Sequence, residues 1–110
     1  MILSTMNDLP GHQVTEVLGD VFGLTVVVRA PASQIEAGLR TFFGGGEARG
    51  LAGQLHEGRL EARRRLREAA GELGADAVLA MRFETSELRE GGLEICAYGT
   101  AVRARRIEEP

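Results

Sequence analysis

Three side chains in this sequence could ligate a soft or borderline metal ion: Cys96, His12 and His56. Such ions need Cys and His ligands at close spacing, as in C-x-x-C or H-x-x-x-H motifs. The three residues lie far apart along the chain, so sequence neighbours form no ligand set. We expect Cys96 to be a small packing residue within a strand, and both histidines to be polar residues at a surface or interface. A ring of subunits that gathers identical residues at its axis is the one route to a metal site left open.

Residues for covalent or acid–base catalysis form no recognisable arrangement. The serines at positions 4, 33 and 86 lie in no nucleophile elbow. Four carboxylates gather in and around one expected hairpin, where charged side chains are usually solvated: Glu84, Glu87, Glu90 and Glu94. The sequence therefore favours a protein that is not an enzyme, with a composite active site between subunits as the alternative.

A glycine run and an arginine run both invite a phosphate-binding interpretation. Gly44-Gly45-Gly46 lacks the G-x-G-x-x-G order after a strand and the Gly-Lys-Ser/Thr of a P-loop, so we interpret it as a turn between helices. The residues 63–65 are all Arg, but four glutamates surround them at positions 57, 61, 68 and 72. Mixed charge of this kind is typical of a solvated helix face. With a net charge of −3, nucleic acid is not an expected partner.

The composition is that of one ordinary globular domain spanning residues 1–110. The single cysteine excludes an intramolecular disulfide and fits a reducing compartment. The N-terminal residues lack the charged and apolar regions of a signal peptide, and no apolar run reaches the roughly 18 residues of a membrane span. We therefore expect a cytoplasmic protein without a membrane partner.

The sequence predicts four strands and two helices, and these elements would position the candidate residues named above. Residues 12–18 and 24–29 read as a hairpin around a turn at 19–23, and residues 76–85 and 93–105 as a second hairpin around 90–92. Ser33 is an expected N-cap for a helix that the glycine run ends. The order predicts an α+β fold in two layers, with an antiparallel sheet and its helices on one face.

The longer helix is predicted over residues 51–73 by one narrow stripe of apolar and small side chains. The stripe consists of Leu51, Leu55, Gly58, Ala62, Leu66, Ala69 and Leu73. Gly74 follows directly, where a left-handed backbone that closes a helix costs glycine nothing. We therefore predict a positive φ at Gly74.

The predicted strands are apolar on both faces. Residues 77, 79, 81 and 83 share one face, yet Val78 and Ala80 occupy the other. In the last strand Leu93 and Ile95 oppose Cys96 and Tyr98. Since one helix layer covers only one face, the second face needs a cover, and another copy of the chain is the expected one.

The order of several segments resembles the YbjQ-like family. These segments are Met1 to Thr5, Val17-Leu18-Gly19, Gly44-Gly45, Leu73-Gly74-Ala75-Asp76-Ala77-Val78 and Ala97-Tyr98-Gly99-Thr100-Ala101-Val102. The resemblance implies a dodecin-like sheet-and-helix subunit, assembled as a homopentamer partly through short extra strands, and a heavy-metal-binding label. Family members often carry a Tyr at the start of the long helix, where this chain has Glu47-Ala48-Arg49-Gly50-Leu51.

Together these features favour a homo-oligomeric protein that binds a small molecule or ion, or acts as a scaffold. Direct heavy-metal binding, resting on the family label, and an enzyme with a composite site are the two alternatives. No catalytic or metal-ligating residue is assigned from the sequence, and it specifies no cofactor.

Overall fold

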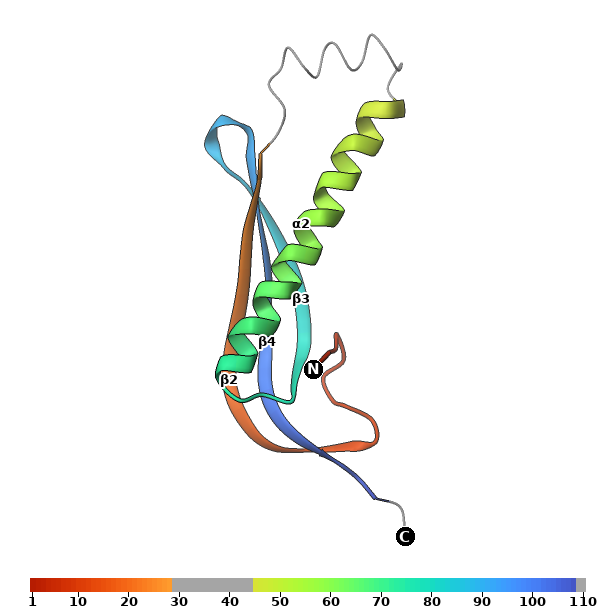
Figure 1. Cartoon of the computed structure of the whole chain (residues 1–110), viewed down its shortest axis with the longest axis vertical. Helices are drawn as coiled ribbons and strands as arrows, with labels where there is room; N and C mark the ends of the chain where they lie inside the picture. The colour runs from red at the N-terminus through yellow and green to blue at the C-terminus, as the bar shows by residue number, and fades with distance from the viewer. Residues whose placement is uncertain (29–44, 109–110) are drawn as a thin grey trace.

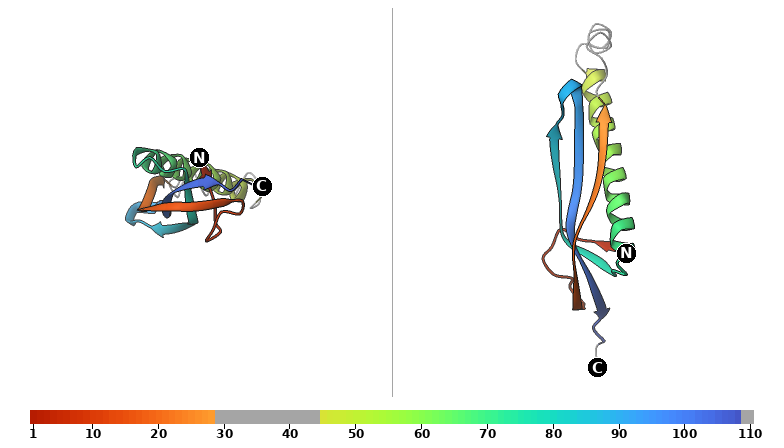
Figure 2. Two further views of the ribbon diagram at one scale, coloured as in Figure 1. Left: turned by 90° about the horizontal axis from the view of Figure 1, so that it is seen from below. Right: turned by 90° about the vertical axis from the view of Figure 1, so that its left-hand side faces the viewer.

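The computed structural model describes residues 1–28 and 45–108 (Figure 1). One four-stranded sheet carries one long helix on one face (Figure 2). The elements in chain order are β1 (Ile2–Leu3), β2 (His12–Val28), α2 (Gly45–Glu72), β3 (Ala77–Glu87), the 3₁₀ turn η1 (Arg89–Gly91) and β4 (Gly92–Arg106). The first of the two predicted helices falls outside the described residues.

The strands lie in the order β1-β3-β4-β2. β4 pairs antiparallel with both β2 and β3, as expected, whereas the short β1 pairs parallel with β3. The sheet is therefore mixed. The sequence did not predict β1 because two residues carry no measurable periodicity.

The predicted hairpin over residues 12–29 is wrong, because β2 runs as one strand from His12 to Val28. Gly19 does not turn the chain back. Its φ of 122° lies at a register shift between Val17 and Gly19, where the pairing with β4 becomes irregular. A glycine at such an irregularity bends a strand without ending it. β4 is nearly as long, with 15 residues against 17 in β2, and two register shifts let it pair with β2 from His12 to Val28.

The helix α2 begins at Gly45, six positions before the predicted start. Gly45 and Gly46 thus belong to its first turn and not to a turn between helices. At the other end Gly74 has a φ of 78°, which confirms the predicted left-handed residue. The N–H of Gly74 donates to the Gly71 carbonyl at 3.0 Å and that of Ala75 to the Ala70 carbonyl at 3.1 Å. These two bonds make a Schellman motif.

The core lies between α2 and the sheet. Ala62, Leu66 and Ala70 are fully buried on the helix and face the fully buried Ile95 and Ala97 of β4. The predicted stripe is thus correct in its middle, while Leu51 and Leu73 at its two ends are exposed. Alternation is strict in β4 from Gly92 to Ala101, so each second residue faces the helix.

Two glycines allow the helix to approach the sheet closely. A Cβ on Gly23 would collide with the backbone of Ala62 and Leu66. A Cβ on Gly58 would lie 2.6 Å from Ile95 Cδ1 and 2.7 Å from Val27 Cγ2. A larger residue at Gly23 would force the two layers apart because it meets backbone, whereas one at Gly58 would have to displace the ends of two side chains.

The prediction that residues 77, 79, 81 and 83 share one face of the third strand is wrong. Ala80 has a φ of 53° and lies at a register shift between Leu79 and Arg82, which changes the side to which later residues point. Met81 therefore joins the core under α2, whereas Leu79 joins a second cluster with Ala77 and Val102. Leu9 of the N-terminal segment packs on that second cluster. The chain thus covers part of its own second face, where we expected a second copy.

Candidate functional site

A row of apolar side chains on β2 lies on the sheet face opposite α2. These residues, which we call the open-face row, are Phe22, Leu24, Val26 and Val28, and they are 53%, 47%, 53% and 70% exposed. They alternate with Val21, Gly23, Thr25 and Val27, which face the helix side. The sequence predicted an apolar second face, and the structure places its uncovered part on this edge strand.

Polar side chains from β4 and β3 continue the open face beside this row. Strand pairing sets Phe22 beside Tyr98 and Leu24 beside Cys96. On the other side of β4, Tyr98 pairs with Arg82 and Cys96 with Glu84. The Tyr98 hydroxyl donates to Glu84 Oε1 at 3.3 Å. Burial and the Glu84 carboxylate raise the pKa of Tyr98, so the phenol stays a neutral donor. The open face is therefore apolar along β2 and polar towards β3.

Cys96 is half-buried on the open face, not packed in the core as we expected. Burial, and then the carboxylates of Glu94 and Glu84, raise the pKa of its thiol. The protonated thiol is a poor metal ligand, since metals bind the thiolate. Within the described part of the chain, no three His, Cys, Asp or Glu side chains gather as a metal site would require.

Neither histidine joins Cys96. His12 is the first residue of β2, and its Nδ1 lies 3.2 Å from the Pro10 carbonyl oxygen. His56 is exposed on α2. Of the predicted carboxylate cluster, Glu84 contacts Tyr98, while Glu90 lies in η1 with a φ of 69°. These positions bring no catalytic pair together.

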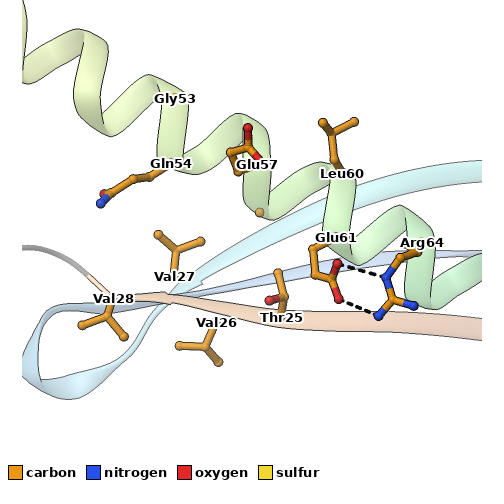
Figure 3. A pocket seen from close by; sticks show the side chains of 11 residues that line it. Thr25, Val26, Val27, Val28, Gly53, Gln54, Glu57, Leu60, Glu61 and Arg64 are labelled. Carbon is orange, nitrogen blue, oxygen red and sulfur yellow. Dashed lines mark hydrogen bonds and ion pairs between the residues drawn. The ribbon is translucent and has the colours of Figure 1, made fainter.

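A groove of about 790 Å³ opens between the last part of β2 and the middle of α2 (Figure 3). Its volume is in the range of small-molecule sites. On the strand side it is lined by residues 25–28, and on the helix side by Gly53, Gln54, Glu57, Gly58, Leu60, Glu61 and Arg64. Sequence reasoning missed this groove because it depends on the angle at which the helix leaves the sheet.

An arginine clamp stands at one end of the groove. Glu61 accepts hydrogen bonds from Arg64 at 2.7 Å and from Arg65 at 2.9 Å (Figure 3 shows the Glu61–Arg64 pair). These two bonds lower the pKa of Glu61 to about 2. Arg65 Nη1 also donates to the Leu24 carbonyl of β2 at 2.6 Å. Arg64 and Arg65 are thus exposed and ion-paired, as the sequence indicated, and Arg65 also joins the helix to the strand edge. Arg63 is half-buried, and its buried Nε has no hydrogen-bond partner among the described residues.

The part of the chain with described coordinates holds no helix whose length and apolar character would suit a membrane crossing.

Residues 1–105 match the family model YbjQ_1, described as "Putative heavy-metal-binding". A UPF0145 protein of Streptomyces coelicolor is 55% identical over 106 residues, covering 96% of this chain and 99% of the relative. One from Archaeoglobus fulgidus is 43% identical over 105 residues, covering 96% of both chains.

A solved structure shares the fold. It is a protein of unknown function of the DUF74 family from Pediococcus pentosaceus, with a TM-score of 0.65 and 16% identity. The match covers 96% of this chain and 98% of that chain.

Proposed function

The chain belongs to the YbjQ_1 family, and on its geometry we propose that it works as a self-assembled binding or scaffold protein, with its ligand site between subunits. The proposed ligand is a small molecule or an ion. The stoichiometry that the family resemblance favours is a pentamer.

The open-face row is the observation that carries this proposal. Four large apolar side chains lie side by side on one exposed strand, where single scattered ones would need no explanation. If another copy of the chain covered these side chains, association would gain about 25 cal/mol of free energy for each Å² of apolar surface removed from water.

Sedimentation equilibrium of the untagged protein at micromolar concentration tests the proposal. We expect the mass of an assembly of two or more 11.8 kDa subunits. A mass of one subunit at these concentrations would exclude it.

Direct heavy-metal binding is the second candidate, favoured by the description of the matching family. Its best donor is Cys96, with Glu84 as its cross-strand neighbour. Calorimetric titration of the wild type and Cys96→Ala with zinc, copper and cadmium separates the candidates. We expect weak binding that is equal in both proteins. Submicromolar binding that is lost in Cys96→Ala would establish the metal function instead.

A further inference from the structure

Three arginines of α2 lie along one flank of the helix without a charged partner. Arg59, Arg63 and Arg67 follow one another at four-residue spacing, and we call them the arginine stripe. Residues four apart on an α-helix lie on the same side, one turn above the other. Within residues 1–28 and 45–108, no side-chain hydrogen bond or ion pair is made by any of the three.

The sequence of the helix explains why the stripe is unpaired. A carboxylate pairs with an arginine on a helix when it lies three or four residues away. Arg64 has Glu61 and Glu68 at these spacings, and both ion pairs form, at 2.7 and 3.2 Å. The same positions around the stripe hold Leu, His, Ala, Arg and Gly, but no Asp or Glu. Three like charges are therefore placed one turn apart, which is unfavourable for a helix unless an anion compensates them.

The stripe occupies the flank of α2 that is turned away from β2. Arg65 donates to the Leu24 carbonyl of β2 at 2.6 Å and to Glu61 at 2.9 Å, so these two side chains mark the β2 side. Glu57 and Glu61 also line the groove on that side (Figure 3). At 3.6 residues per turn, Arg63 lies about 200° around the helix from Glu61. The helix thus separates its charges, with ion pairs on one flank and unpaired positive charge on the other.

Arg63 is the anchored member of the stripe. It is half-buried, and its Nε is buried without a hydrogen-bond partner among the described residues. A buried donor without a partner is rare in proteins and needs an explanation. Arg59 and Arg67, one turn before and one turn after, are exposed. Because each guanidinium has five N–H donors in a planar fork, the stripe can donate to several oxygen atoms at once.

The acidic flank of a second copy of the helix does not match the stripe. Its Glu61 and Glu68 are already paired with Arg64. Glu57 and Glu72 have no ion pair among the described residues, but they lie about 22 Å apart along the helix axis. The whole stripe spans only about 12 Å by the same measure. A compact anion of high charge fits this arrangement better than two distant carboxylates.

We infer that the arginine stripe binds a small molecule that carries a chain of phosphate groups. Guanidinium groups bind phosphate through two parallel hydrogen bonds, which gives both strength and geometric selectivity. Successive arginines are about 6 Å apart along the axis, a gap that long flexible side chains close around one ligand. The site needs one helix of one subunit. It therefore goes beyond the proposed site between subunits and does not depend on assembly.

Calorimetric titration of the untagged full-length protein with tripolyphosphate, at low salt, tests the inference. Orthophosphate is the comparison, and we expect tripolyphosphate to bind about tenfold more tightly or better. Arg63→Gln and Arg67→Gln should each weaken tripolyphosphate binding about tenfold, because each removes charge-assisted hydrogen bonds. Arg64→Gln is the matched control. It removes the same charge from the same helix, but from a side chain that Glu61 and Glu68 already hold, so it should bind like the wild type.

Circular dichroism and light scattering accompany the titrations, and Arg59→Gln at an exposed position replaces Arg63→Gln if that variant does not fold. An equal loss of binding in Arg64→Gln would show an effect of net charge alone and overturn the inference. Equal affinities for orthophosphate and tripolyphosphate would overturn it as well. A wild type that binds no tripolyphosphate would also overturn it, and a changed assembly mass of Arg63→Gln would then identify a second copy on the stripe, leaving self-assembly intact.

Discussion

The two faces of this four-stranded sheet differ in what covers them. On the helix side, Leu66 and Ile95 are fully buried, and Gly23 brings the layers into contact. On the opposite side, Val26 and Val28 are more than half exposed. The helix-covered face is the core of one subunit. The open face is apolar like a core but is exposed to water. Its side chains would therefore add to stability only when another subunit covers them.

The largest expected effect on stability comes from a cavity made on the helix side of the sheet. Leu66→Ala should lower the free energy of unfolding by about 3 kcal/mol, since it removes a fully buried side chain. The matched change on the open face, Val28→Ala, should alter subunit stability by less than about 0.5 kcal/mol. It should instead raise the concentration at which subunits dissociate. Equal losses in chemical denaturation would show that the two faces do not differ.

A second change tests the close approach of the layers. Gly23→Ala should destabilise by about 2 kcal/mol, because the added methyl meets helix backbone that cannot move aside. Gly53→Ala on α2 is the control, since a Cβ there meets nothing within 4 Å. It should be neutral or stabilising by up to about 1 kcal/mol. In thermal melts, the melting temperature should therefore fall for Gly23→Ala and stay the same or rise for Gly53→Ala.

A substitution at the C-terminal end of α2 should have a smaller effect on stability. Gly74→Val should cost more than about 1 kcal/mol, because a β-branched residue disfavours the φ of 78°. The nearest atom to the new side chain is the mobile end of Arg103, so backbone strain is the main cause. An unchanged melting temperature would argue against the Schellman motif as a source of stability.

The smallest expected effect concerns the exposed arginine clamp. Because the pKa of Glu61 is lowered from 4.5 to about 2, the stability that its ion pairs add is complete above pH 4.5. It is lost as the pH falls towards 2. Glu61→Gln should therefore be slightly less stable than wild type at pH 7, and this difference should shrink between pH 4.5 and 2. Glu57→Gln, which removes a carboxylate one turn earlier, should show no such change.

Much of the helix-covered face could be predicted from the sequence. The alternation of β4, the middle of the α2 stripe and the φ of Gly74 all follow from local patterns. The continuity of β2 through Gly19 could not be predicted, because it depends on the length of β4 as a partner. A local glycine-rich turn and a bulged strand give similar sequence signals.

The candidate site was harder to predict than the core. The sequence indicated a second apolar face, but its position depends on two features without a local signal. The irregularity at Ala80 moves Leu79 out of the helix-side core, and Leu9 then covers the cluster that Leu79 joins. What stays open is the row on β2. The groove beside it depends on a helix angle that no periodicity encodes.

Self-assembly through the open-face row is the central claim, and one light-scattering comparison tests it directly. Val26→Lys places a charge in the row opposite Glu94, its cross-strand neighbour, so the subunit should keep its fold. Leu73→Lys adds the same charge at an exposed position near the end of α2. We predict a multi-subunit mass for the wild type and Leu73→Lys, and a single-subunit mass for a folded Val26→Lys. A Val26→Lys protein that keeps the wild-type mass would contradict the account.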